Sequence, residues 1–387
     1  MSVDTTNVTD VTNNTNVTNA KPKTKELKTH ITLLLCLLLV AGCRNGSKQS
    51  YDKLGASGMT ERTENLAANL PRFASQGVMI GQWYATVSGV GWRCDSVGAE
   101  THETRSDINS ICNDHPIVTA CELAGIEEGH DRNVDGIRFD VIRQDILAMS
   151  RRGGLTLLFW TMPRPASEKS EEEYIKATAE YLSSLSDGYG IKAPVCLVPL
   201  PLDRSDRWYA QLPPQEYSAL HASLTKRLRA AGVTNAVFGY SCRAMPTLDE
   251  FLSRYPRSGV SVVNLHALAP EATDTAHYAK TLASAIDILA EVASLKQVAA
   301  GVTAGIANSL SDTFFSDTLL PLVTRPGISY AVFGPNSGEP DSHTAYVPYP
   351  GSGGIDGFMK LYNHPRTLFA HDVNGLYLKK EQAAEKN

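Results

Sequence analysis

The stretch APVCLVPLPLD, residues 193–203, has the pattern of a buried apolar strand that ends in a polar loop punctuated by proline. Short apolar runs of this kind alternate along the chain with helical patterns, which is typical of parallel strands joined by helices. In such folds the functional side chains lie where strands end and loops begin. The residues that follow this strand, Pro201, Leu202 and Asp203, are therefore central to any prediction of function.

Further runs with the strand pattern recur at regular intervals on both sides of this stretch. The expected strands are Val78–Gln82, Ile117–Leu123, Leu155–Trp160, Val195–Leu200, Ala236–Tyr240, Val260–Leu265, Val298–Thr303 and Ile328–Phe333. Between them, apolar residues three and four positions apart predict amphipathic helices. The clearest are Phe139/Ile142/Ile146/Met149 before Gly153, Tyr217/Leu220/Leu224/Leu228 before Gly232, and Tyr278/Leu282/Ile286/Leu289. Eight strands with intervening helices predict an α/β fold, an eight-stranded β/α (TIM) barrel in a single domain.

The composition is that of a globular protein with enough apolar material for one large core. Of the 387 residues, 42% are hydrophobic and 20% are charged, and the formal net charge is −5. An acidic chain without a long run of like charge is not expected to bind nucleic acid. No Cys/His spacing has the pattern of a zinc site, and the sequence implies no metal or organic cofactor.

The first 50 residues differ in composition from the rest of the chain. Residues 1–20 are rich in Asn and Thr and are expected to be disordered. Residues 21–42 hold a lysine cluster and then the apolar run ITLLLCLLLVA, which is too short to span a bilayer and has the length of a signal-peptide core. A signal peptide is therefore expected over residues 21–42.

The signal-peptide core ends in Val40-Ala41-Gly42-Cys43, which resembles a bacterial lipobox. The resemblance implies cleavage before Cys43, a lipid on its thiol, and attachment to a membrane of the bacterial cell envelope, with the outer membrane expected. The sequence does not choose between the periplasmic and the surface face. An ordinary signal peptide followed by an incidental cysteine is the alternative.

The expected domain boundaries follow from these features. Residues 43–72 are expected to be a tether, residues 73–380 the barrel, and residues 381–387 a charged tail. Outside the cytoplasm Cys94 and Cys112, which lie in loop-like sequence, have the option of forming a disulfide.

From Gly81 onward the motifs resemble those of glycoside hydrolase family 26, whose characterised members are mainly β-mannanases. The resemblance covers roughly residues 75–378. The motifs that carry it are GQWYATVSGVGW from Gly81, PIVTACEL from Pro116, GGLTLLFW from Gly153 and, most specifically, YVPYPG from Tyr346 with the tail through Tyr377. It implies a TIM barrel with a glycan cleft at the carboxyl ends of the strands.

The departures from the family pattern fall where its catalytic glutamates stand. The family carries His-Glu after its fourth strand, with the Glu as general acid, and this chain has Pro201-Leu202 there. The family's nucleophilic Glu lies on its seventh strand, but residues 296–305 hold no carboxylate, and the matching position is Val302 or Thr303. Glu122 stands where the second strand of the family usually has an Asp.

The family mechanism needs two carboxyl groups about 5 Å apart, one as acid and one as nucleophile. Pro, Leu, Val and Thr supply neither group, so the sequence predicts loss of this mechanism. Asp203 and Glu122 are the candidate carboxylates if catalysis is retained by relocation. For Asp203 the alternative is a loop-capping role within DRSD, and for Glu122 it is the ordering of loops.

Glycan binding does not require those glutamates, because aromatic rings stack on sugars and polar side chains bond hydroxyl groups. The predicted glycan-binding residues are Trp83, Trp92, Glu122, Trp160, Trp208 and His266, all near strand ends or the loops that follow. For each Trp the alternative is a packed residue of the barrel rim, and for His266 it is a structural role.

Three hypotheses for function follow. The first is a membrane-anchored, catalytically degenerate family 26-like barrel that binds polysaccharide, with a mannan-type β-glycan favoured. The second is an active endo-acting glycoside hydrolase with relocated carboxylates. The third is a structural or assembly lipoprotein without a glycan site. An open cleft lined by Trp favours the first, and two inward carboxyl groups about 5–9 Å apart favour the second.

Overall fold

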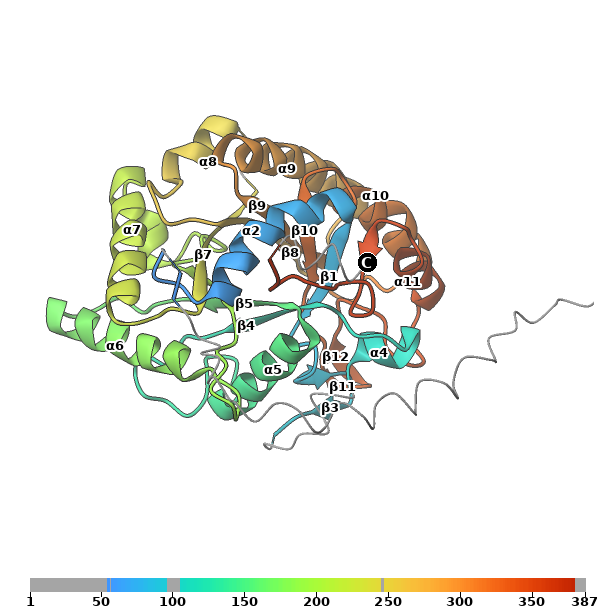
Figure 1. Cartoon of the computed structure of the whole chain (residues 1–387). Coiled ribbons are helices and arrows are strands. Elements are labelled where there is room, and N and C mark those ends of the chain that lie inside the picture. Colours follow the sequence, from blue (N-terminus) through green and yellow to red (C-terminus); the bar gives the residue numbers. More distant parts are fainter. Residues whose placement is uncertain (1–53, 56, 96–104, 245–246, 380–387) are drawn as a thin grey trace, which may run out of the picture. The chain divides into compact units, whose positions relative to one another are not determined.

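The computed structural model describes residues 54–55, 57–95, 105–244 and 247–379. The expected disordered segment, signal peptide, lipid site Cys43 and tail 381–387 lie outside these residues. Eight parallel strands form a closed barrel (Figure 1) in the order β1-β4-β5-β6-β7-β8-β9-β10, and β10 pairs with β1 to close it. The strands are β1 Val78–Trp83, β4 Val118–Glu122, β5 Leu155–Trp160, β6 Val195–Pro199, β7 Ala236–Arg243, β8 Val262–Ala269, β9 Ala299–Ile306 and β10 Ile328–Phe333. The predicted TIM barrel is confirmed.

All eight predicted strands are present, but three of them continue well beyond their predicted ends. β7 continues to Arg243, β8 to Ala269 and β9 to Ile306. In β8 the first four residues are buried and the last four only half-buried. The extended end of β8 forms one side of the cleft described below.

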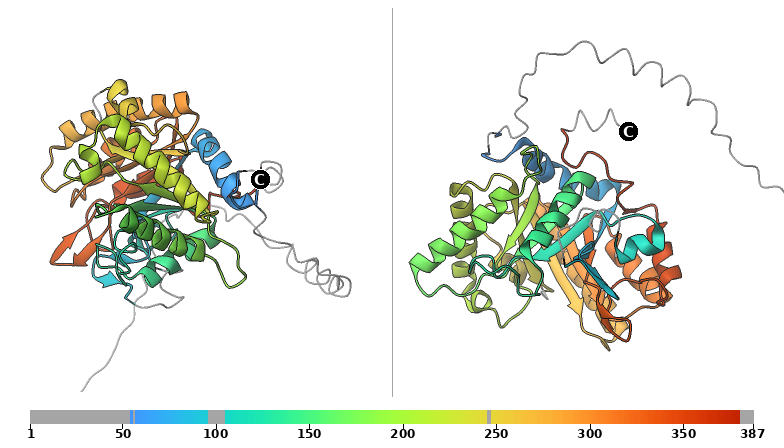
Figure 2. Two further views of the ribbon diagram at one scale, coloured as in Figure 1. Left: turned by 90° about the vertical axis from the view of Figure 1, so that its left-hand side faces the viewer. Right: turned by 90° about the horizontal axis from the view of Figure 1, so that it is seen from below.

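Helices surround the barrel on its outside (Figure 2). They are α2 Glu61–Gln76, α4 Asp107–Cys112, α5 Phe139–Arg152, α6 Glu168–Ser184, α7 Pro214–Ala230, α8 Leu248–Arg254, α9 Thr275–Lys296, α10 Leu320–Val323 and α11 Ile355–Tyr362, with short turns η1 Trp208–Gln211 and η2 Phe314–Leu319. The three predicted helices correspond to α5, α7 and α9. α5 ends where expected, because Gly153 takes φ +77° and caps its last carbonyls.

The tether expected over residues 43–72 is too long. Residues 61–76 form α2, which buries Leu66, Leu70 and Phe73. Thr60 N donates to Thr234 O, just ahead of β7, and Gly77 leads directly into β1, so α2 lies across the amino end of the barrel (Figure 1). The barrel domain therefore begins before residue 73.

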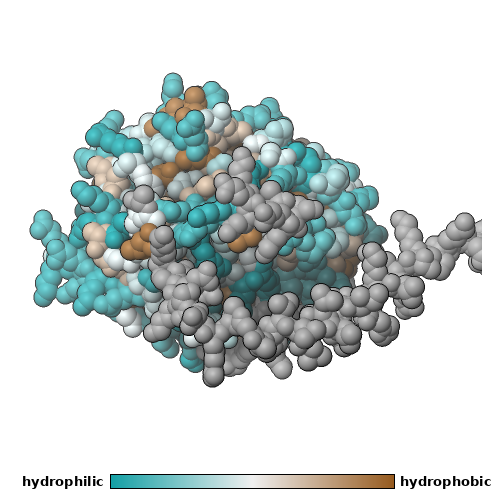
Figure 3. All heavy atoms as spheres, viewed as in Figure 1, coloured by the Kyte–Doolittle hydropathy of each residue, from teal (hydrophilic) through white to brown (hydrophobic). Residues whose placement is uncertain are grey.

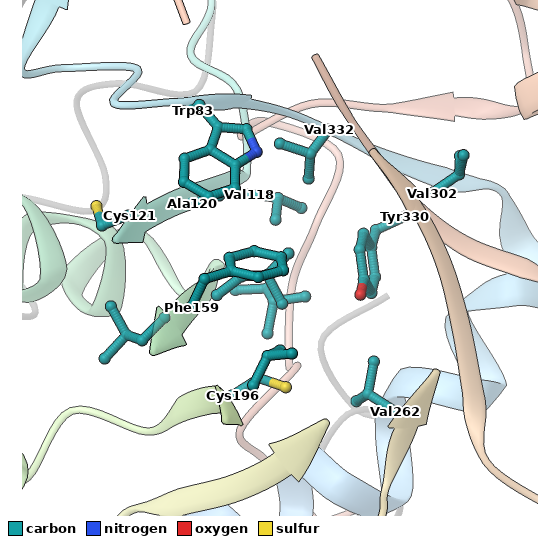
Figure 4. Packing of buried hydrophobic residues seen from close by; sticks show 14 of the residues in the cluster. Trp83, Val118, Ala120, Cys121, Phe159, Cys196, Val262, Val302, Tyr330 and Val332 are labelled. Atoms are coloured by element: carbon teal, nitrogen blue, oxygen red, sulfur yellow. The ribbon is translucent and has the colours of Figure 1, made fainter. Parts of the chain in front are cut away.

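Side chains fill the barrel interior (Figure 4). Tyr330 of β10 lies over Gly301 of β9, where an added Cβ would stand 1.9 Å from the tyrosine ring. Higher in the barrel, Trp83 stacks on Phe159 with ring centroids 4.8 Å apart. Because the interior is a packed core, binding is confined to the carboxyl rim.

The disulfide considered for Cys94 and Cys112 is not formed. Cys112 is a free thiol at the end of α4, and its Sγ donates to the Ile108 carbonyl at 3.1 Å and to the Asp114 carbonyl at 3.5 Å. Burial raises the pKa of this thiol to about 11.

Within the described residues, none of the helices combines the length and the apolar character needed to cross a bilayer. The face seen in Figure 3 is mostly hydrophilic where its residues are described, with small separate hydrophobic spots.

Candidate functional site

A cleft of about 400 Å³ opens at the carboxyl end of the barrel. The end of β1 forms its floor, and the half-buried end of β8 forms one side. The short strands β2 Ser88–Gly89 and β3 Trp92–Arg93, the loop at residues 135–137 and the start of β11 Ser337–Glu339 complete it. Its lining residues are Trp83, Tyr84, Ser88, Trp92, Arg93, Asp135, Ile137, His266, Leu268, Pro335, Ser337 and Gly338.

The wall of the cleft is built from two small hairpins. β11 pairs with β12 Ser342–Thr344, and β2 pairs with β3. The backbone joins the hairpins, because Gly91 N donates to Gly338 O at 2.8 Å. Gly338 has φ +90° and an added Cβ would lie 2.4 Å from the Ser342 carbonyl, so this turn requires glycine.

Trp92 lies on this wall and is held by hydrogen bonds beneath it. Its Nε1 donates to Asp107 Oδ1 at 2.7 Å, and Asn336 Nδ2 donates to the other oxygen at 2.8 Å. The Arg105 guanidinium lies 4.7 Å from the ring centroid. Trp92 is half-buried and lines the cleft, so it is positioned to contact a ligand.

Trp83 ends β1 and lines the cleft, and its ring lies over Phe159 in the packed interior (Figure 4). It is 9% exposed, and among the described residues its Nε1 has no hydrogen-bond partner. A buried indole N–H normally has a partner.

Next to Trp83, Tyr84 joins three segments of the cleft. Its hydroxyl donates to Asp135 Oδ2 at 2.6 Å and accepts from Asn133 Nδ2 at 2.9 Å and from the Glu122 backbone N–H at 3.0 Å. Burial is the main cause that raises its pKa well above the usual value, and the charge of Asp135 adds to it. Sequence reasoning missed Tyr84 and Asp135, although Tyr84 directly follows Trp83 and the polar run NVDG marks a loop after a strand.

Glu122 is buried behind the cleft and orders loops. Its Oε1 accepts from the backbone N–H groups of Leu123, Ala124 and Thr161 at 2.9–3.0 Å, and Oε2 accepts from Thr161 Oγ1 at 2.7 Å. Burial raises the pKa of this carboxyl to about 7, against the lowering effect of those donors. Since both oxygens are occupied and Glu122 does not line the cleft, the loop-ordering alternative fits the geometry.

Two of the predicted tryptophans are not at the cleft. Trp160 is 0% exposed, and its Nε1 donates to Glu127 Oε2 at 3.1 Å, so its ring cannot stack on a sugar in this structure. Trp208 is half-buried, donates from Nε1 to the Met162 carbonyl at 2.9 Å and packs edge-on against Tyr209. The prediction for Trp160 is therefore corrected, and that for Trp208 receives no support from the cleft.

The chain after β6 has a local irregularity that sets the positions of the next residues. Leu200 takes φ +53°, and Leu202 then returns to the sheet and pairs with Cys242 of β7. Leu202 N donates to Ser241 O at 2.8 Å, and Leu202 is 4% exposed. An irregularity of this kind re-aims the residues that follow it.

Asp203 comes next, and its carboxylate lies at the rim of the barrel. Its Oδ2 lies 3.6 Å from Arg207 Nη2, and its Oδ1 is buried without a hydrogen-bond partner among the described residues. The local pair within DRSD is instead Arg204 with Asp206. Asp203 does not cap its own loop, so the capping alternative does not fit the structure.

His266 links the Asp203 carboxylate to the cleft. It lies in the extended part of β8, lines the cleft, and has a buried Nδ1 without a partner in the described part of the chain. Burial lowers its pKa, while the negative charge of Asp203 acts in the opposite direction. The structure thus brings Trp83, Trp92 and His266 to one cleft, and it places Trp160 in the core. Asp203 lies outside the lining, but its charge acts on His266.

Comparisons with known proteins rest on structure. No family model matches the chain, and no curated protein matches it. A GH26 β-mannanase from Bacteroides ovatus is 26% identical with a TM-score of 0.75, covering 83% of this chain and 98% of that one. The chain has the fold of glycoside hydrolase family 26.

Other solved structures agree in fold at lower identity. A GH26 protein from Muricauda is 19% identical over 83% of this chain and 94% of its own, with a TM-score of 0.71. A β-mannanase from a symbiotic protist of the termite Reticulitermes speratus, solved with a gluco-manno-oligosaccharide, is 12% identical over 81% of this chain and 94% of its own, with a TM-score of 0.55. The predicted family 26 resemblance is confirmed.

Within the described residues of this barrel, no three His, Cys, Asp or Glu side chains are grouped so as to hold a metal ion. What the rim offers is aromatic surface, an indole N–H, an imidazole nitrogen and carboxylate oxygens. Such groups bind sugar hydroxyls and ring faces.

Proposed function

We propose that this chain binds polysaccharide, with a mannan-type β-glycan as the ligand, in the cleft at the carboxyl end of its barrel, and that it does not hydrolyse the glycan by the family 26 mechanism. The cleft carries the proposal: it is open, Trp83 and Trp92 line it, and two of its lining residues, Trp83 and His266, each have a buried ring nitrogen without a hydrogen-bond partner among the described residues. The choice of glycan rests on the β-mannanases that share the fold.

The absence of hydrolysis rests on the positions that the resemblance assigns to the catalytic pair. Leu202 stands at the position of the acid and is a buried residue paired with β7. Strand β9 carries no carboxylate, and Thr303 on it is buried with its hydroxyl 3.3 Å from Asn264 Nδ2. Neither position supplies the acid or the nucleophile that a retaining glycosidase needs.

Binding is tested by affinity gel electrophoresis of the purified protein in gels containing β-mannan, with reducing-sugar release measured in parallel. Retarded migration without product is expected. Trp92→Ala is expected to weaken retardation, and Trp208→Ala is the matched control because that indole is bonded to Met162 outside the cleft lining. Equal retardation of both variants and the wild type would argue against this cleft as the site.

Hydrolysis with a relocated carboxylate is a second candidate, favoured by the unpartnered Oδ1 of Asp203 next to the cleft. It would need a second carboxyl group within about 5–9 Å. Product release from mannan that Asp203→Asn abolishes would establish it. Absence of both binding and turnover would leave the third hypothesis, a barrel that serves as a structural lipoprotein.

We propose further that a lipid on Cys43 anchors the protein to the bacterial envelope, as the lipobox-like Val40–Cys43 suggests. The test compares wild type with Cys43→Ser after expression with its own amino-terminal segment. Wild-type protein is expected in the membrane fraction and labelled by a fatty-acid probe. Membrane retention of Cys43→Ser equal to that of wild type would overturn the proposal.

A further inference from the structure

A second pocket, of about 330 Å³, opens at the carboxyl ends of β6 and β7, and Leu202 lines it. Its lining comes from the loop after β6, the end of β7 and the helix α8. The residues are Leu202, Arg204, Ser205, Ala210, Arg243, Ala244, Glu250, Ser253 and Arg254. Its polar lining differs from that of the aromatic cleft.

The arginines of this pocket differ in how many of their guanidinium N–H groups have a hydrogen-bond partner. Arg204 is held by both carboxylate oxygens of Asp206, with Nε 2.9 Å from Oδ1. Arg254 donates from Nη1 to the Leu212 carbonyl at 2.9 Å, and its other N–H groups have no partner among the described residues. Arg243 is exposed, and the described residues include no carboxylate paired with it.

Glu250 is the acidic residue of the lining, and no salt bridge joins it to an arginine within the described part of the chain. Two guanidinium groups, from Arg243 and Arg254, are thus left with free donors in one pocket. The planar guanidinium fork matches the oxygens of carboxylate, sulfate and phosphate groups and bonds them in pairs.

We propose that this pocket binds an anionic oxyacid group carried by the glycan, such as the carboxylate of a uronic acid or a sulfate ester. This inference rests on the proposed function, because the pocket adjoins the Asp203 loop at the same end of the barrel as the cleft. A glycan that extends from the cleft past the Asp203 loop would bring a charged substituent to Arg243 and Arg254. The protein would then prefer acidic glycans to neutral ones.

The test uses one mannan in three forms: neutral, oxidised at C6 to introduce carboxylates, and sulfated. Calorimetric titration at low salt is expected to give at least about tenfold tighter binding of an anionic form than of the neutral form, as one charge-assisted contact would supply. The oxidised and sulfated forms distinguish the two sources of charge. The preference should shrink as salt is raised.

Arg243→Gln is expected to remove most of this preference while leaving the binding of neutral mannan unchanged, and Arg243→Glu is expected to reverse it. Arg164→Gln is the matched control, because Arg164 is exposed in the loop after β5 and lines neither pocket. Since Arg243 is exposed, these variants should retain the wild-type melting temperature.

The outcomes separate the two proposals. Equal binding of neutral and anionic mannans, or loss of the preference in Arg164→Gln to the same extent, would overturn the anionic pocket and leave the proposed function intact. Binding of an anionic form alone, lost in Arg243→Gln, would support the pocket and overturn neutral mannan as the ligand. Binding of none of the three forms would overturn both.

Discussion

Asp203 Oδ2 lies 3.6 Å from Arg207 Nη2, while Asp203 Oδ1 is buried without a partner among the described residues. A carboxylate oxygen that is desolvated without a hydrogen bond is costly in the free protein. A ligand hydroxyl that donates to it would relieve that cost. This relationship makes Asp203 the polar residue through which the rim is expected to hold a glycan.

Asp203→Ala is accordingly expected to weaken the binding of β-mannan about tenfold, since the hydrogen bond lost involves a charged acceptor. Asp206→Ala is the control, because that carboxylate pairs with exposed Arg204. Calorimetric titration of both variants measures the difference. An Asp203→Ala variant that binds as well as wild type would remove Asp203 from the site.

Trp83→Phe tests the indole N–H apart from the aromatic surface. Phenylalanine retains a ring to stack on Phe159 but lacks the Nε1 donor that has no partner in the described chain. Loss of one neutral hydrogen bond is expected to weaken glycan binding about two- to tenfold with little change in the melting temperature. If binding is unaffected while the fold is intact, the N–H does not contact the ligand.

Glu122 is expected to make the stability of the fold depend on pH. Its pKa is raised from 4.5 to about 7, so the folded state binds more protons than the unfolded state between these values, and stability falls as pH rises through this window. Glutamine resembles the protonated form and can keep the backbone bonds to its oxygen.

Glu122→Gln is therefore expected to match wild type near pH 4.5 and to exceed it above pH 7, by up to about 3 kcal/mol. Urea unfolding of the two proteins from pH 4.5 to 8 measures the difference, with Glu128→Gln as the control. A wild-type-minus-variant difference that stays constant with pH would contradict the burial of an ionisable Glu122. Glu122→Ala should be destabilised throughout, because three backbone N–H groups lose their acceptor.

His371 is expected to add a small dependence in the same direction at higher pH. Its pKa is raised, first by the hydrogen bond to Asp114 and further by the charges of Asp114 and Asp372. A raised histidine pKa gives stability that is complete below about pH 6.5 and is lost as pH rises through the folded-state value.

The size of this effect is limited because the His371 side chain is 61% exposed, so less than about 1 kcal/mol is expected. His371→Asn should lower the melting temperature at pH 6 and leave it nearly unchanged at pH 9, and His130→Asn should change neither. A loss of stability in His371→Asn that is equal at both pH values would show that the ion pair is not its cause.

The barrel could be predicted from sequence because its strands are buried on both faces and appear as short, continuous apolar runs. The helix α2 was missed because it follows a polar, tether-like segment, although Leu66, Leu70 and Phe73 are spaced as on one helix face. Its contribution depends on contacts with strand ends that lie far away in the sequence.

The site was less predictable, because the direction of a side chain at a strand end depends on register. Trp83 and Trp160 both end strands, yet Trp83 lines the cleft and Trp160 is buried, and the sequence does not distinguish them. The position of Asp203 depends on the positive φ of Leu200, a conformation that leucine rarely adopts. The contact of Tyr84 with Asp135 joins loops 51 residues apart.

The most direct test of the account measures reducing ends released from β-mannan by wild-type protein at a concentration that saturates binding, beside an active family 26 mannanase. We expect the protein to retain the glycan and to release no product above the protein-free blank. Product release by the wild type that Asp203→Asn abolishes would contradict it and establish a relocated active site.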